Sequence, residues 1–262
     1  DQQAQSIGNG VVKEGLMVSN IGTGAQVSAF TKKDIYDGHL RTHTFCHGVP
    51  KAYTIFGAML CGGLSIDWLK NNILHEFNFK KMTEKAANVE PGCGGLLCIP
   101  YLSGERTPYM NPDARGIYFG LSLEHNESHM IRAMMEGVTF ALKDSMRILE
   151  ENGVICEKMI ASGGACNSPV WLQIQADIFG KEILVCKTKE QACLGACIMA
   201  GVATGVYDDL QSACDNLVIF DEKTYSPREE YRQMYDNMYY KFRKIYKYTK
   251  RYMGCDREKE SC

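Results

Sequence analysis

The sequence predicts an α/β domain built on a mixed sheet with flanking helices, and three observations support this prediction. Near the N-terminus, apolar and polar residues alternate in two strand pairs, LMVSNIG with AQVSAFT and THTFCH with AYTIFG. Farther along the chain, helical and strand patterns follow one another, as they do in parallel α/β units. The chain has 262 residues, 45% hydrophobic and 23% charged, which is enough for one full core. One domain with antiparallel and parallel strand neighbours is therefore expected.

In the first half of the chain, each element has a local signal. The first hairpin turns at Gly-Thr-Gly, residues 22–24, and the turn-forming GVPK joins the second strand pair. A helix is predicted over SIDWLKNNILHEF, with Ile66, Ile73 and Phe77 on its apolar side. GLLCIPYL then indicates a buried strand, SGERTPYMNPDARG a long polar loop, and RGIYFGLS another strand. This half of the chain is thus expected to contain mostly strands.

Helices dominate the prediction for the second half. The longest should run from about Asn126 to Asn152, where apolar residues recur every three or four positions. A second helix has Ser168 as its N-cap and follows the short strand KMIAS. The strand EILVCK and the small-residue helix ACLGACIMAGVATG come next. The last helix opens with Ser226 and Glu229 in capping-box spacing.

Charge and hydropathy argue against nucleic-acid and membrane partners. The net charge is −2 and the pI about 6.3, so the chain has no global basic field. Apolar runs such as YTIFGAML are far too short to span a bilayer. The last helix carries six bases, which are interpreted as the solvated side of an amphipathic helix: Lys241, Arg243, Lys244, Lys247, Lys250 and Arg251.

The 12 cysteines are interpreted as free thiols, mostly structural. Many sit in apolar or small-residue stretches, and no C-x-x-C pair occurs. HTFCH could supply metal ligands, but a strand would send Cys46 and His47 to opposite faces. Structural cysteines are therefore favoured over a zinc site, and the thiols indicate a reducing cytoplasm.

Two glycine-rich turns are candidates for ligand binding. In ASGGACNSPVW, Gly163 and Gly164 would let a ligand approach the backbone just before a capped helix, which suits a nucleotide. In IGTGAQ, Thr23 lies between two glycines whose amides could form an anion nest. Taken alone, each is equally well an ordinary tight turn. The charged loop residues Glu105 and Arg106 could touch a ligand, but loop charges usually meet solvent.

Taken in order, several segments resemble the C-terminal half of the FGGY carbohydrate kinases. They are DQQA, IGTG, PYLSGERTPYMNPDARG, SGGACNSPVWLQIQAD and EQACLGACIMAG. The stretch from Gly116 to Glu136 (GIYFGL, seven residues, then HMIRAMME) matches the signature of that family. The resemblance covers residues 1–210, and among family members it is greatest to those that phosphorylate D-xylulose.

The resemblance implies an actin-like, ribonuclease-H-like fold that binds ATP in a cleft between two domains. Residues 1–14 would carry the catalytic aspartate at the junction with a missing N-terminal domain. Residues 15–210 would form the nucleotide-binding domain, and residues 211–262 a helical tail. ATP and Mg²⁺ are the implied cofactors. The magnesium ligands would lie upstream, so no metal ligand is assigned within this chain.

The resemblance also implies roles for individual residues. Asp1 corresponds to the catalytic base, and Gln2 to a contact with the polyol in glycerol kinases. Thr23, flanked by Gly22 and Gly24, corresponds to the contact with the terminal phosphates. Other positions would line the nucleotide: Gly63, Asp67, Gly163, Gly164 and Ser168.

The implied function is ATP-dependent phosphorylation of a sugar hydroxyl, foremost the conversion of D-xylulose to D-xylulose 5-phosphate in the cytoplasm. The isolated chain would be inactive without its N-terminal domain. One alternative is a kinase of the same family for glycerol or another ketose. Another is a non-catalytic actin-like module that binds sugar or nucleotide. A homodimer is compatible with each of these hypotheses.

Overall fold

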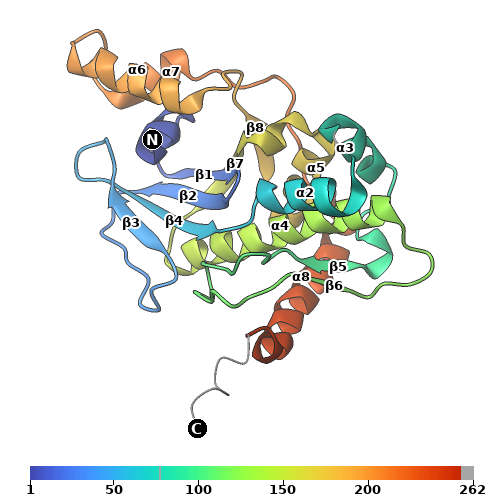
Figure 1. Cartoon of the computed structure of the whole chain (residues 1–262). Helices are drawn as coiled ribbons and strands as arrows, with labels where there is room; N and C mark the ends of the chain where they lie inside the picture. Colours follow the sequence, from blue (N-terminus) through green and yellow to red (C-terminus); the bar gives the residue numbers. More distant parts are fainter. Residues whose placement is uncertain (77, 255–262) are drawn as a thin grey trace.

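The computed structural model describes residues 1–76 and 78–254, and a six-stranded mixed sheet lies at its centre (Figure 1). The strand order is β3-β4-β2-β1-β7-β8. The β1–β2, β2–β4 and β3–β4 pairs are antiparallel, whereas β1–β7 and β7–β8 are parallel, so the predicted mixed sheet is confirmed. The strands are β1 (Gly15–Ile21), β2 (Ala25–Thr31), β3 (His43–Cys46), β4 (Tyr53–Met59), β7 (Cys156–Gly163) and β8 (Glu182–Val185). A separate antiparallel pair joins β5 (Leu97–Ile99) to β6 (Ile117–Phe119).

Both faces of the sheet are covered, because successive side chains of each strand point to opposite faces. On β1, Met17 belongs to the main core, which includes residues of α4 and α5, whereas Val18 belongs to a smaller cluster with Phe30 and Ile160. The helices are α1 (Gln2–Gly8), α2 (Gly63–Trp68), α3 (Phe79–Ala87), α4 (Glu127–Glu151), α5 (Pro169–Phe179), α6 (Gln191–Ala203), α7 (Leu210–Leu217) and α8 (Glu229–Thr249). None of these described helices is long and apolar enough to cross a membrane.

Some elements differ from the sequence-based expectations. The helix expected over residues 65–77 is α2 followed by a π-helical turn, Leu69–Leu74, and it ends at His75 in the left-handed region. Phe77, expected on its apolar side, lies outside the described residues. Helices α1 and α3 are formed by segments for which no helix was predicted.

The capping box expected at Ser226 is wrong, because α8 begins three residues later, at Glu229. Tertiary partners hold the segment before the helix. The backbone N–H of Arg228 donates to Asp177 at 2.9 Å, and its guanidinium pairs with the same carboxylate at 2.6 Å. The Ser226 carbonyl accepts from Gln173. Contacts with α5 therefore override the local capping signal.

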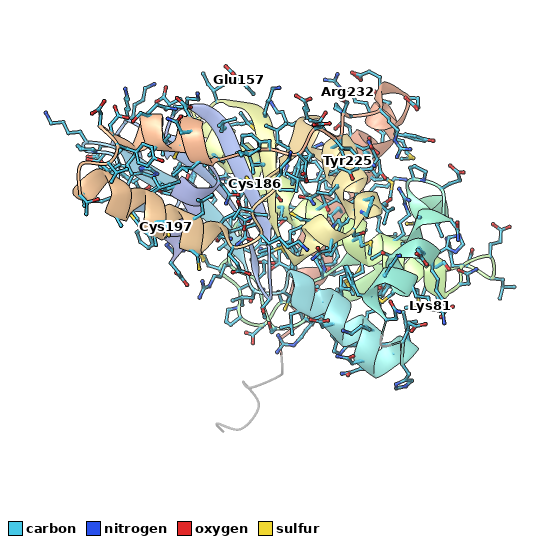
Figure 2. The ribbon with its side chains drawn as sticks, turned by 90° about the horizontal axis from the view of Figure 1, so that it is seen from above. Lys81, Glu157, Cys186, Cys197, Tyr225 and Arg232 are labelled. Atoms are coloured by element: carbon cyan, nitrogen blue, oxygen red, sulfur yellow. The ribbon has the colours of Figure 1, made fainter. Side chains whose placement is uncertain are left out.

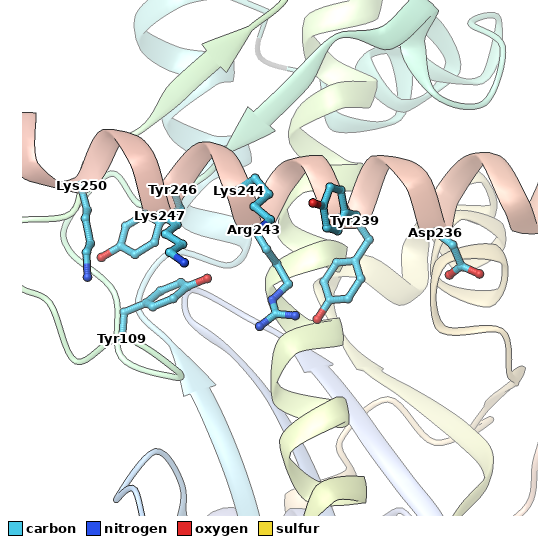
Figure 3. Close-up of a pocket in the computed structure, with 9 residues that line it drawn as sticks. Tyr109, Asp236, Tyr239, Arg243, Lys244, Tyr246, Lys247 and Lys250 are labelled. Atoms are coloured by element: carbon cyan, nitrogen blue, oxygen red, sulfur yellow. The ribbon is translucent and has the colours of Figure 1, made fainter.

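Helix α8 packs against α4 and against the loop of residues 100–116 (Figure 3). Tyr239 donates a hydrogen bond to the buried Asp144 of α4 at 2.5 Å. Tyr246 accepts one from Asn111 of the loop at 2.9 Å, and its ring centroid lies 4.0 Å from that of Tyr109. The aromatic face of α8 is thus an internal surface that joins two other parts of the domain.

The signature segment around Arg132 and Glu136 is structural. The two side chains form a buried ion pair on α4 at 2.9 Å, and Tyr235 of α8 donates to Glu136 at 2.8 Å. Arg132 also donates to the carbonyl of Val89, and Glu136 accepts from the N–H of Gly92. Since both charges are paired and hydrogen-bonded, the pair can be buried without an uncompensated charge.

Candidate functional site

The hairpin turn of residues 22–24 is held against the start of α2. The carbonyl of Gly22 accepts from the N–H of Gly63 at 2.7 Å, and that of Thr23 accepts from Leu64 at 3.0 Å. A Cβ atom on Gly63 would lie 2.6 Å from the Gly22 carbonyl oxygen, so only glycine allows this approach. The position of Thr23 is therefore set by contacts on both sides of the turn.

The second glycine-rich turn lies beside the first. Strand β7 runs parallel to β1 with Gly163 opposite Ile21, and Gly163 has a φ of +82°. A Cβ atom there would lie 2.5 Å from the Ile21 carbonyl oxygen. The chain then makes a short 3-10 turn, Gly164–Asn167, and enters α5. The parallel pairing thus brings together two turns that are about 140 residues apart in the sequence.

A hollow of about 370 Å³ opens between the two turns and α2. We call it the glycine hollow. It is lined by Ile21, Gly22, Thr23, Gly63, Ile66, Asp67, Phe79, Gly164, Ala165, Asn167 and Trp171. Its lining is mainly apolar, which suits a flat ring system, and it includes three glycines.

A second hollow, of about 430 Å³, lies on the other side of the hairpin turn. We call it the aspartate hollow. Its lining is largely polar and consists of Asp1, Gln2, Gln5, Asn20, Gly22, Thr23, Gly24, Ala25, Gln26, Ala58, Met59, Arg106 and Ala192. The two hollows share Gly22 and Thr23, so they are neighbours across one turn.

Helix α1 positions Asp1 in the aspartate hollow. Asp1 is its N-cap, and the carboxylate accepts from the N–H of Gln2 at 2.6 Å. The side chain of Gln5 donates to Ser162 on β7 and accepts from Asn20 on β1, both at 3.2 Å. These bonds hold α1 over the carboxyl ends of the two parallel strands.

Helices α1 and α6 cross at glycines. A Cβ atom on Gly8 would lie 1.8 Å from the Gln191 carbonyl oxygen, and one on Gly195 would lie 1.8 Å from the Ala4 carbonyl oxygen. Figure 1 shows α6 beside the N-terminus and α1. The small residues of α6 thus allow the backbone contact that fixes the helix bearing Asp1.

The structure groups most of the residues assigned from the sequence. The aspartate hollow brings together Asp1, Gln2, Gly22, Thr23 and Gly24, and the glycine hollow adds Gly63, Asp67 and Gly164. Gly163 lines neither hollow but shapes the turn. Ser168 is buried and caps α5 by accepting from Trp171 at 3.3 Å, while its neighbour Asn167 lines the glycine hollow.

Other lining residues could not be assigned from the sequence. Arg106 comes from the long polar loop, and the sequence of such a loop does not indicate where a charged side chain points. Glu105, beside it, is only 2% exposed, so the expectation that it meets solvent is wrong. Trp171 and Phe79 also line the glycine hollow, but in the sequence they look like ordinary apolar residues of a core. Only the packing of distant segments reveals that these side chains share a site.

None of the cysteines in residues 1–76 and 78–254 lines either hollow. Cys46 is exposed, whereas His47 is buried, at 8% exposure. Figure 2 shows Cys197 on α6, where it is also exposed. Within the described residues, no three His, Cys, Asp or Glu side chains gather closely enough to hold a metal ion.

Residues 17–204 match the C-terminal domain of the FGGY family of carbohydrate kinases. The chain belongs to this family. It is 34% identical over 252 residues to a xylulose kinase from Staphylococcus epidermidis, covering 95% of this chain and 50% of that protein. It is 35% identical over 228 residues to a gluconokinase from Bacillus subtilis, covering 82% and 44%. The chain therefore spans about half the length of the curated relatives that it matches.

Solved structures of FGGY kinases have the same fold. Ligand-bound xylulose kinase from Lactobacillus acidophilus superposes with a TM-score of 0.88 at 25% identity, over 96% of this chain and 51% of that one. Glycerol kinase from Plasmodium falciparum with ADP gives a TM-score of 0.83 at 25% identity, over 94% and 50%. The actin-like fold expected from the resemblance is confirmed.

Proposed function

We propose that this chain is the nucleotide-binding half of an ATP-dependent carbohydrate kinase whose acceptor is D-xylulose. The observation that carries the proposal is the meeting of the two hollows at Gly22 and Thr23. A nucleotide in the glycine hollow would direct its terminal phosphate past Thr23 towards Asp1. Several of the similar relatives are named xylulose kinases, which supports the choice of acceptor.

In this proposal, Asp1 takes the proton of the acceptor hydroxyl. The hydroxyl oxygen bonds to the γ-phosphorus, the bond to the β–γ bridging oxygen breaks, and its electron pair leaves with ADP. A positioned base is typically worth about 10²–10⁴-fold in rate. Phosphoryl transfer otherwise depends on positioning and charge neutralisation. The buried Gln2 Nε2, which has no hydrogen-bond partner within the described residues, is suited to donate to an acceptor oxygen beside Asp1.

Mg²⁺ would neutralise charge on the nucleotide phosphates. The residues present do not form a complete metal site, because Asp1 and Asp67 are the only carboxylates that line the described hollows. Asp67 is paired with Lys70 at 2.8 Å. We therefore propose that Mg²⁺ is bound through the phosphates and through residues of an upstream domain.

The test is ADP release by a two-domain protein in which this chain follows an FGGY N-terminal half. The acceptors are D-xylulose, D-ribulose, L-ribulose, D-gluconate and glycerol. We expect preference for D-xylulose, and loss of at least about 10²-fold in turnover in Asp1→Asn, because Asn cannot accept the proton. The control is Asp113→Asn, which changes an exposed carboxylate outside both hollows.

Each other outcome has a distinct meaning. Preference for glycerol or D-gluconate would retain the mechanism and overturn the acceptor. Unchanged turnover in Asp1→Asn would overturn the role of Asp1 as base. Nucleotide binding without ADP release for any acceptor would favour the non-catalytic module.

A further inference from the structure

Arg106 lies in the aspartate hollow with Asp1 and Thr23, and it is the only lysine or arginine among the described residues that line either hollow. Its side chain is exposed and forms no ion pair with any carboxylate in the described part of the chain. An arginine that is free of a protein carboxylate can bind an anionic ligand without first breaking an internal pair.

The residue before Arg106 holds its backbone firmly. Glu105 exchanges two 2.8 Å backbone hydrogen bonds with Asn111, closing the loop on itself. The Glu105 carboxyl group is buried, and one of its oxygens accepts from the N–H of Arg106 at 2.6 Å. Burying an acidic side chain such as that of Glu105 is unfavourable unless the group is hydrogen-bonded. The hydrogen bond that Glu105 makes is to the backbone N–H of Arg106, so it helps to hold the backbone of Arg106 in place.

The residue after Arg106 is held as well. Thr107 is fully buried, and its N–H donates to the carbonyl of Ala58 at the end of β4 at 2.9 Å. Its hydroxyl accepts from the Ala58 N–H at 3.1 Å and donates to the Arg41 carbonyl at 2.7 Å. Arg106 is thus an exposed side chain on a backbone that is fixed at both neighbouring residues.

We propose that Arg106 contacts the γ-phosphate of the bound nucleotide and stabilises the charge on the phosphoryl group during transfer to the acceptor. This inference rests on the proposed function. The bonds made and broken are those given above: the acceptor oxygen bonds to phosphorus, ADP leaves with the electron pair, and the proton passes to Asp1. Arg106 forms no covalent bond and gives up no proton, since a guanidinium stays charged. Arg106 and Thr23 line the same hollow, so the guanidinium would supply positive charge near the turn at which the two hollows meet.

The test uses the two-domain protein described above, without acceptor, and compares its affinities for Mg-ATP and Mg-ADP by calorimetry. We expect Arg106→Ala to weaken ATP binding about tenfold, which corresponds to about 1.4 kcal/mol, and to leave ADP binding unchanged. Arg106→Lys should bind ATP with an affinity between those of wild type and Arg106→Ala, because lysine keeps the charge but lacks the planar guanidinium. The control is Arg232→Ala, an exposed arginine on α8.

The outcomes separate this inference from the proposed function. Equal ATP affinity in wild type and Arg106→Ala would overturn the inference and leave nucleotide binding intact. Equal losses for ATP and ADP would also overturn it, because they indicate a role in shaping the hollow rather than contact with the γ-phosphate. Failure of the wild-type two-domain protein to bind either nucleotide would overturn the proposed function and the inference that rests on it.

Discussion

Glu105 is a buried acid in a loop that the sequence presents as polar. Burial raises the pKa of its carboxyl to about 8, and one oxygen has no hydrogen-bond partner within the described residues. The protonated form is therefore favoured in the folded protein at neutral pH. An unfolded glutamate, with a pKa near 4.5, releases its proton at much lower pH. The side chain should consequently make folding stability depend on pH.

We expect the stability contributed by Glu105 to be present below about pH 4.5 and to be lost as the pH rises towards about 8. Between pH 5 and 8, wild type should lose on the order of 3 kcal/mol more than Glu105→Gln, which cannot ionise. Urea unfolding at both pH values measures this difference. Glu124→Gln, at an exposed site, is the control and should behave like wild type. Parallel pH curves for wild type and Glu105→Gln would show that Glu105 is ionised in the folded state.

At the scale of elements, the crossing of α1 and α6 depends on two glycines in backbone contact. Gly195→Ala would place a methyl group 1.8 Å from the Ala4 carbonyl oxygen, and backbone cannot rotate away as a side chain can. We expect a loss of about 2–3 kcal/mol, as for overpacking in a core, measured by urea unfolding.

Gly201 on the same helix provides a matched control. A Cβ atom there would meet only the ring of Tyr207, at 3.1 Å, and that ring can shift. Gly201→Ala should be neutral or stabilising by up to about 1 kcal/mol, because alanine favours helix. If the two variants lost equal stability, the helices would not be in the close contact described.

At the scale of the whole molecule, α8 connects the polar loop to the central helix α4. Tyr246 is 1% exposed and packs on Tyr109 and Tyr101, with ring centroids at 4.0 and 5.3 Å. Tyr240, six residues earlier on the same helix, is 62% exposed. The same substitution at the two positions therefore tests whether this face of α8 is part of the core.

Tyr246→Ala should lower the free energy of unfolding by about 3–5 kcal/mol, the usual range for deleting a buried aromatic ring. Tyr240→Ala should change it by less than about 0.5 kcal/mol, as at most surface sites. Urea unfolding gives both values, and limited proteolysis should show earlier cleavage within residues 100–116 in Tyr246→Ala. Similar stability in both variants would mean that α8 is not joined to the core.

Local chemistry made much of the fold predictable from the sequence. The glycines at residues 22 and 24 mark the hairpin turn, the N-cap at Ser168 satisfies a nearby amide, and the apolar repeat of α4 extends over 25 residues. Each of these signals acts within a few residues, so it is visible without tertiary contacts. The resemblance to the FGGY kinases supplied the grouping of Asp1 with Thr23 and Gly164, which no local signal indicates.

Only the tertiary structure decided which distant residues meet. Pairing of β1 with β7 places two turns side by side, and anchoring of the loop to β4 brings Arg106 to Asp1. The start of α8 depends on Asp177, a residue of α5, rather than on its own capping signal. Such contacts join residues some 50 to 140 positions apart, and their energies depend on packing that the local pattern does not contain. The sequence by itself thus determined most of the elements and their turns, and the packing determined the composition of the site.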